Sequence, residues 1–129
     1  MRPMRIIRKF LPVLVAGLLA VPAAAQETEQ SFLEGFPDVP ILAGVRGIDG
    51  ESVFFDTPSG IIAEVKLLIE GDGEQVMNTY AQALAGLGWV CEKKPQSLRC
   101  GRDKTRLIFF DTDPTVKNGR LILRLEPIK

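Results

Sequence analysis

The sequence contains no histidine, and only two cysteines, one tryptophan and one tyrosine occur among its 129 residues. Without histidine, the Ser-His-Asp and Cys-His nucleophile systems are excluded and the commonest metal ligand is missing. A metal site would have to supplement two thiolates with carboxylates, which is an unusual ligand set for structural zinc. Internal repeats and low-complexity tracts are also absent from the sequence. We therefore expect no catalytic residue, no metal site and no cofactor.

Long apolar runs are missing as well, except for "LPVLVAGLLAV" at residues 11–21. This run is shorter than the ~20 residues with which a helix spans a membrane. It follows a basic segment and precedes Ala23 and Ala25, the pattern of a secretory signal peptide with an A-x-A cleavage site. We expect residues 1–25 to be removed after Ala25 and the protein to be periplasmic. The alternative is an uncleaved N-terminal anchor.

The sequence has no excess charge of either sign, with 16 basic and 16 acidic residues. Four of the basic residues and none of the acidic ones lie in the first 25 positions, which leaves 12 basic and 16 acidic residues in the other 104. A net charge of about −4 argues against nucleic acid or an anionic membrane surface as a partner. A chain of this length suits one domain with its own core, and we expect a monomer.

Residues 26–50 should form an extended arm, because they contain two prolines and four glycines. Residues that precede proline are restricted to extended conformations, so Phe36 and Val39 should be extended and no helix should form. Two roles remain open for the arm. Its apolar side chains can pack on the core, or Phe36, Pro37 and Asp38 can contact a partner.

Residues 51–129 have the pattern of a single α+β domain. Alternating hydrophobicity on both sides of "DTPSG" predicts a β-hairpin at 52–70. An amphipathic helix should follow, with Asp72 as its N-cap, a capping box completed by Gln75, and a left-handed end at Gly86 or Gly88. The apolar stripe expected on this helix consists of Val76, Tyr80, Ala83, Leu84 and Leu87.

Four more strands are expected after the helix, at 89–94, 98–103, 106–112 and 120–128, with a turn at Asn118-Gly119 before the last. The resulting order along the chain is ββαββββ. Because strands do not alternate with helices, we expect an antiparallel sheet with the helix packed on one face, as a two-layer sandwich.

Cys91 and Cys100 lie in the hairpin expected around Pro95-Gln96. If the hairpin is centred on that pair, residues whose numbers sum to 191 face each other, and the two cysteines are directly opposed. Opposed Cα atoms are about 4.5 or 5.5 Å apart, which is within reach of a disulfide. A four-residue loop on a type I turn, residues 94–97, would suit proline at its second position.

The compartment and the spacing favour a structural disulfide over the other roles of two cysteines. An exported protein meets oxidising conditions, whereas a redox pair is more typically C-x-x-C at a helix N-terminus. Free thiols with a structural role and a metal site are the remaining alternatives. We expect Trp89 to share the face of Cys91 and Leu98 to lie on the other face.

The tip of the disulfide-linked hairpin is a candidate partner-binding site, because a preorganised loop loses little entropy on binding. Its residues are Lys93, Lys94, Pro95 and Gln96.

Other polar residues have simpler structural interpretations. Asp56, Asp111 and Asp113 are candidates for carboxylate chemistry or calcium, but "DTD" before a proline is typical of a turn. Tyr80 lies on the helical stripe and should pack in the core. A basic run predicts a solvated hairpin face, with a small anion site as the alternative; it comprises Arg99, Arg102, Lys104 and Arg106.

Three stretches together resemble small exported bacterial α+β domains of unknown function. These are "FPDVPILAGV", "VFFDTPSGII" and "VMNTYAQALAGLGW". The helix of such domains has the pattern V-x-x-F-Y-x-x-x-L-x-x-L-G-W; Leu84, Leu87, Gly88 and Trp89 match it, and the first aromatic is replaced. The resemblance covers most of residues 36–125 and implies a fold, with no catalytic residue to carry over. The cysteine pair is not part of this pattern.

Three functions are compatible with these features. The first is a non-enzymatic periplasmic domain that binds or supports an envelope component. The second is an inhibitor or regulator of a secreted enzyme, acting through the stapled hairpin tip. The third is a small carboxylate-dependent enzyme, which the sequence supports least.

Overall fold

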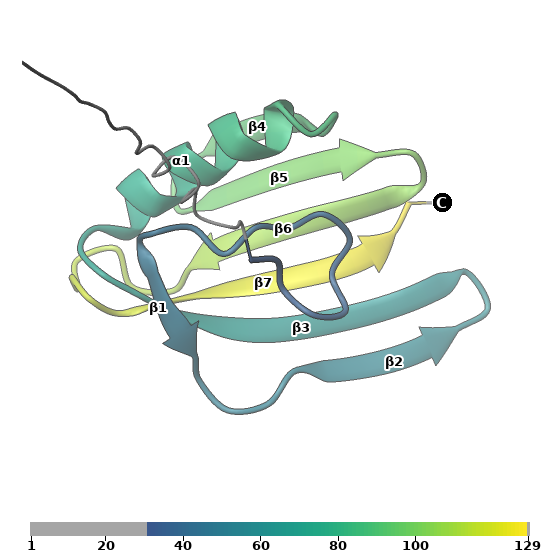
Figure 1. The fold of residues 1–129 in the computed structure, drawn as a ribbon, viewed down its shortest axis with the longest axis horizontal. Helices are drawn as coiled ribbons and strands as arrows, with labels where there is room; N and C mark the ends of the chain where they lie inside the picture. The colour runs from purple at the N-terminus through teal and green to yellow at the C-terminus, as the bar shows by residue number, and fades with distance from the viewer. Residues whose placement is uncertain (1–30, 129) are drawn as a thin grey trace, which may run out of the picture.

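Seven strands and one helix make up residues 31–128, the part of the chain that the computed structural model describes. The predicted signal peptide, residues 1–25, lies outside these residues. The α+β class is confirmed, with a mostly antiparallel sheet and one helix (Figure 1). The elements are β1 (Val45–Ile48), β2 (Val53–Thr57), β3 (Gly60–Ile69), α1 (Gly73–Ala85), β4 (Val90–Lys94), β5 (Ser97–Arg102), β6 (Thr105–Asp111) and β7 (Arg120–Pro127).

The strands are arranged in space in the order β1-β3-β7-β6-β5-β4, and β2 also pairs with β3. The expected order ββαββββ is wrong by one strand, because β1 forms within the segment expected to be an extended arm. This strand is short, contains Gly47, and shifts register between Val45 and Gly47. Its local sequence carries little strand preference, and its pairing with β3 creates the strand.

Strand β3 is the longest and joins the two parts of the sheet. It pairs with β2 through its first half, with β1 through its last residues, and with β7 along its other side. The β2–β3 hairpin confirms the one predicted at 52–70. Alternate residues of β3 are buried on one face, as the period of two requires, and they are Ala63, Val65, Leu67 and Ile69.

Helix α1 begins as predicted but differs in detail at both ends. The Asp72 side chain accepts a hydrogen bond from the Glu74 amide at 3.2 Å, whereas Gln75 makes no return bond within residues 31–128, so the capping box is not formed. Gly86 is right-handed, and Gly88 takes the left-handed conformation with φ 93°. A side chain would strain this backbone, which explains glycine after the helix.

Helix α1 and the arm together cover one face of the sheet. Helix α1 contacts β4, β5 and β6, while the arm, residues 31–44, lies beside it over β7 and β3 (Figure 1). Met77 joins the buried helical stripe, and Leu87 leaves it, because the chain has already left the helix at that point. The buried residues of the arm are Leu33, Phe36 and Val39, so the arm is part of the hydrophobic core.

Candidate binding surface on the uncovered face of the sheet

The predicted register of the cysteine hairpin is confirmed. Cys91 pairs with Cys100 and Glu92 with Arg99, and the two sulfurs form a disulfide. The Cα atoms are 4.0 Å apart, closer than the expected 4.5 or 5.5 Å. The expectation that Leu98 lies on the other face is wrong. Residues two apart on a strand share a face, so Leu98 and Cys100 are both buried on the core side.

The turn of this hairpin differs from the expected type I. Pro95 is at its second position as predicted, but Gln96 at the third has φ 65°, which is the signature of a type II turn. Gln96 tolerates this conformation because it is bonded on two sides. Its carbonyl accepts from the Asp111 amide at 2.8 Å, and its Nε2 donates to the Asp111 carbonyl at 3.3 Å.

The candidate residues of the tip are partly committed to contacts within the domain. Lys93 lies on the core side of β4, and its Nζ is 2.9 Å from Glu74 Oε2 on the helix. Gln96 is tied to strand β6. Lys94 and Pro95 remain exposed, so they are the part of the tip that a partner could reach.

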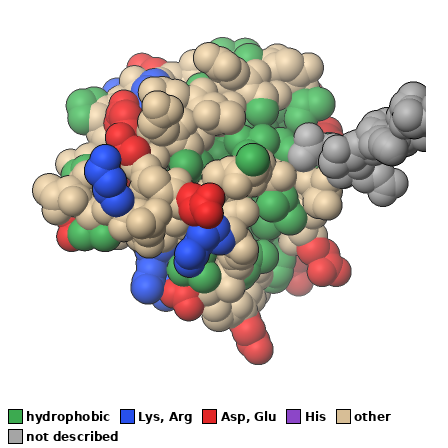
Figure 2. Space-filling model, turned by 60° about the vertical axis from the view of Figure 1, so that its left-hand side comes forward, with side chains coloured by type: hydrophobic (Ala, Val, Ile, Leu, Met, Phe, Trp, Pro, Cys, Tyr) green, Lys and Arg blue, Asp and Glu red, His purple; other side chains and the backbone are tan. Residues whose placement is uncertain are grey.

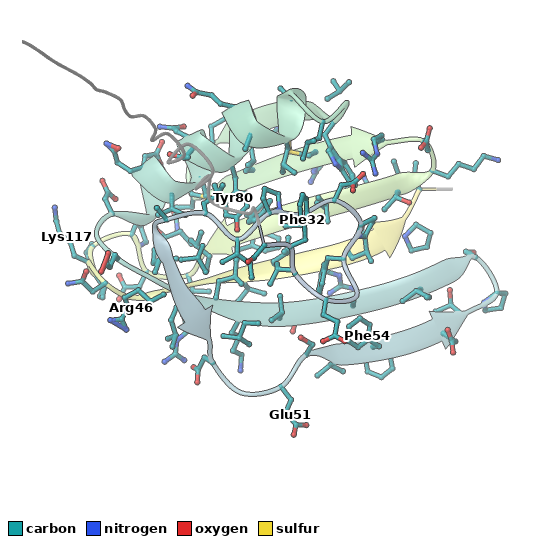
Figure 3. The ribbon with its side chains drawn as sticks, in the orientation of Figure 1. Phe32, Arg46, Glu51, Phe54, Tyr80 and Lys117 are labelled. Carbon is teal, nitrogen blue, oxygen red and sulfur yellow. A yellow bond between two sulfur atoms is a disulfide. The ribbon has the colours of Figure 1, made fainter. Side chains whose placement is uncertain are left out.

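The candidate residues of the arm are also used internally. Phe36 is 3% exposed, and its ring centroid is 6.0 Å from that of Phe54 on β2, which is labelled in Figure 3. Asp38 Oδ2 lies 3.0 Å from Arg102 Nη1. Pro37 alone remains exposed without such a contact. The arm therefore contributes to folding more than to the surface.

Arg102 connects three segments at this point. Besides its ion pair with Asp38, its Nη1 donates to the Leu87 carbonyl at 2.9 Å, just beyond the helix. Its guanidinium lies 4.5 Å from the centre of the Trp89 ring, whose buried Nε1 has no hydrogen-bond partner within the described chain. Arg106, further along the basic run, pairs with Glu126 at 3.3 Å. These two members of the run are neutralised by acids, which weakens the anion-site alternative.

Tyr80 is fully buried in the core, as expected from its place on the helical stripe. It donates a 2.7 Å hydrogen bond to the Pro40 carbonyl of the arm, beneath helix α1 (Figure 3). Burial raises the pKa of Tyr80 to about 12, and a backbone hydrogen bond with Leu42 partly opposes this. The side chain ties the helix to the arm.

The three candidate carboxylates do not form a common site. Asp56 pairs with Ile61 at the β2–β3 turn, whereas Asp111 pairs with Leu121 at the other end of the sheet. Asp111 Oδ1 accepts from the Asp113 amide at 3.2 Å, which is the expected turn chemistry. Within the described part of the chain, no three Cys, Asp or Glu side chains form a group that could hold a metal ion.

Asp111 is the only charged residue buried among those described, and its place explains a glycine. A Cβ at Gly73, the first residue of α1, would collide with the Asp111 carboxylate. A negative charge at this position interacts favourably with the partial positive charge of a helix N-terminus. We therefore interpret Asp111 as structural.

The other face of the sheet is not covered by the helix or the arm. Charged side chains form a continuous row across it from β3 to β6. Arg124 lies between two acids, 4.0 Å from Glu64 and 3.1 Å from Glu126, and Glu126 in turn contacts Arg106. Each ion pair is partly exposed and adds little stability. Their effect is that the row carries no net charge.

Two hollows flank this row at the end of the face near β2. One, of about 630 Å³, lies between Val53, Phe55 and Ile62 on the apolar side and the Glu64–Arg124 pair on the other. The second, of about 720 Å³, is lined by Arg106 and Glu126 and also by Pro127 and Ile128. Thr57 and Ile62 line both. The hollows therefore adjoin, and their lining is more apolar than polar.

Sequence reasoning missed this surface, although the pattern contains a signal for it. In the predicted hairpin, β2 reads "VFFDT", with large apolar residues at consecutive positions, so both faces of the strand had to be apolar. Figure 2 shows another side of the molecule, on which basic and acidic side chains are interspersed with hydrophobic ones.

Comparison of the chain with protein-family models, with curated proteins and with solved structures found no match. No helix within residues 31–128 is long and apolar enough to cross a membrane.

Proposed function

We propose that this protein is an exported, non-enzymatic domain that binds a protein component of the cell envelope through the uncovered face of its sheet. The observation that carries the proposal is the pair of adjoining hollows, whose lining is more apolar than polar and beside which the four charged side chains of the row are paired with one another. Such a site favours the burial of apolar side chains from a partner. Export, which is compatible with the disulfide, is part of the same proposal.

The arrangement favours binding over catalysis because its charged groups have opposite-sign partners. A general acid or base needs a group free to exchange a proton with a substrate, often with a perturbed pKa. Glu64, Glu126, Arg106 and Arg124 are instead held in one neutral row. The one raised pKa described, that of Tyr80, belongs to a buried residue on the opposite side of the sheet.

Co-purification with two matched variants tests the proposal. The full chain would be expressed in a cell that exports it and recovered with covalently cross-linked partners. Ile62→Lys, at the centre of the two hollows, should lower recovery of the partner about tenfold or more. Val90→Lys, at an exposed position on β4, should not. Equal recovery with both variants, or no partner with the wild type, would contradict the proposal; thermal unfolding would verify that both variants fold.

A second candidate remains the regulation of a secreted enzyme through the hairpin tip. The observation in its favour is rigidity: the disulfide fixes the strands, and Gln96 is bonded to β6, while Lys94 and Pro95 stay exposed. The same experiment separates the two surfaces. A partner lost on Lys94→Glu with Pro95→Ala but retained on Ile62→Lys would identify the tip.

A further inference from the structure

Strand β2 ends the sheet on one side, and β3 is the only described strand that pairs with it (Figure 1). Its outer edge therefore presents backbone amide and carbonyl groups that no other described strand uses. Natural proteins usually protect such an edge with lysines, proline or a bulge. Between Val53 and Thr57 none of these is present, and Asp56 is the only charge.

Exposed apolar side chains concentrate at the same edge. Val53 and Phe54 are each 47% exposed, and Phe55 is 59% exposed. Ile61 of β3, at 49%, lies next to them. These four are among the ten large apolar residues exposed in the described chain, and no other strand supplies more than two. We call them the β2 cluster.

Contacts with the arm, on the covered face of the sheet, hold β2 in place. The Phe54 ring packs directly against the backbone of Gly35, where a Cβ would collide with it, and lies 6.0 Å from the ring of Phe36. Val53 and Phe55 point to the opposite, uncovered face, because side chains alternate along a strand. The edge is therefore a preformed template and needs little ordering to pair.

We propose that β2 pairs with β2 of a second copy of this chain, antiparallel and about a two-fold axis perpendicular to the sheet. With the axis at Phe55, all five residues of the strand find a partner. Phe55 faces Phe55 of the second copy, Val53 faces Thr57, and Phe54 faces Asp56. Aromatic pairs and pairs of β-branched residues are among the favourable cross-strand combinations. The uncovered faces of the two copies then form one continuous surface.

The distribution of acids supports this register. An axis at Asp56 would place the two Asp56 carboxylates opposite each other, which is unfavourable. With the axis at Phe55 they are separated, and Glu51 in the preceding loop faces Ser59 of the β2–β3 turn. Glu51 projects from the loop before β2 on the side of the open edge in Figure 3, and in this register it lies opposite an uncharged serine of the second copy. No like charges are opposed in this arrangement.

The available area sets the expected strength of the dimer. A large aromatic side chain buries on the order of 200 Å² when it is fully covered, so the half-exposed β2 cluster offers on the order of 400 Å² per copy. Standard stable interfaces bury about 800 Å² per partner. We therefore expect a reversible dimer that dissociates on dilution. Val53 and Phe55 also line the first hollow. Self-pairing does not rest on the binding function proposed above, and its test measures oligomeric state and not recovery of a partner.

Sedimentation velocity of the exported protein, with its disulfide oxidised, tests the pairing between about 1 µM and about 500 µM. The wild type should shift from monomer to dimer across this range. Phe55→Lys should stay monomeric at the highest concentration, and Val90→Lys on the opposite edge should behave as the wild type. A wild type that stays monomeric throughout, or a Val90→Lys variant that also loses the dimer, overturns the proposal.

A cysteine at the axis tests the register directly. Opposed residues have Cα atoms about 4.5–5.5 Å apart, so Phe55→Cys should form a disulfide between two copies on mild oxidation. Val90→Cys is the control, since it is 80% exposed but lies on β4. A cross-linked dimer of Phe55→Cys alone supports the pairing. Absence of that dimer, or equal cross-linking of both variants, shows that another partner or none occupies β2.

Discussion

Strands β4 and β2 form opposite edges of one sheet, yet their side chains differ in kind. In β4, Glu92, Lys93 and Lys94 follow one another, and a disulfide fixes the strand to β5. In β2, three apolar residues are consecutive and no covalent link is present. Proline follows both strands and does not distinguish them. Because charge discourages an edge from pairing with another chain, we expect β4 to be closed to pairing and β2 to be open to it.

The two halves of the core also differ in the kind of segment that covers them. A regular helix covers the β4 half, whereas an arm without regular structure covers the β2 half (Figure 1). The helix satisfies its own backbone groups, but the arm depends on contacts such as the hydrogen bond from Tyr80 to Pro40 and the ion pair between Asp38 and Arg102. The β2 half should thus be the more easily loosened of the two.

Removal of the disulfide should lower the free energy of unfolding most, because it removes the covalent link between β4 and β5 that β2 lacks. Closing a loop of about ten residues contributes about 2.5–3 kcal/mol in the chain-entropy model. We expect the double variant Cys91→Ala with Cys100→Ala to lose about that amount, measured by urea unfolding with Trp89 fluorescence. Reduction of the wild type should produce the same loss and leave the variant unchanged. A loss of under about 1 kcal/mol in the free energy of unfolding would show that the disulfide contributes little to stability.

Deprotonation of Tyr80 should loosen the arm, and hence the β2 half, by a similar or slightly smaller amount. Its pKa is raised from 10 to about 12, so the folded state retains the proton longer than the unfolded chain does. The associated stability, about 2–3 kcal/mol, is fully present below pH 10 and is lost as the pH rises toward 12. Ultraviolet titration measures this pKa directly, since the chain has one tyrosine. Tyr80→Phe should lack this part of the pH dependence; a normal titration near pH 10 would contradict the burial.

Truncation of Phe54 should loosen β2 from the arm without touching the β4 edge. A fully buried Phe→Ala change costs about 3–5 kcal/mol, and since Phe54 is half exposed we expect about 1.5–2.5 kcal/mol. Urea unfolding gives the value, and Phe110→Ala is the matched control because it is also exposed but lies on β6 away from the arm. An equal loss in both variants would indicate that the Phe36–Phe54 contact contributes nothing specific.

Loss of the Lys93–Glu74 ion pair should have the smallest effect. The two side chains are 23% and 52% exposed, and such pairs contribute about 0.2–1 kcal/mol. A double-mutant cycle with Lys93→Ala and Glu74→Ala isolates the coupling. Its decrease with added salt would identify it as electrostatic. A coupling well above about 1 kcal/mol would contradict the expectation of a weak, partly exposed ion pair.

Local patterns in the sequence were sufficient for much of the fold. The β2–β3 hairpin, the start of the helix and the pairing of Cys91 with Cys100 each follow from a turn or a cap together with a period of hydrophobicity. The face on which Leu98 lies could also have been predicted, because the correct register implies that it shares the face of Cys100.

Other features depend on neighbours that are distant in the sequence. Val45–Ile48 becomes a strand because β3 provides an edge, and nothing in its own residues requires it. The positive φ of Gln96 is stabilised by Asp111, fifteen positions later. The uncovered face could not be located before the strand order was known, because the order brings Glu64, Arg124 and Arg106 into one row. The candidate surface is therefore a product of topology.

Because Arg102 contacts Trp89, intrinsic tryptophan fluorescence should report whether the arm is attached. The sequence has a single tryptophan, and the guanidinium that lies over its ring also holds Asp38 of the arm. When the arm detaches, Arg102 loses the ion pair with Asp38 that helps to orient its guanidinium over the indole. The emission of this one residue should consequently follow attachment of the N-terminal segment in real time, without any added dye.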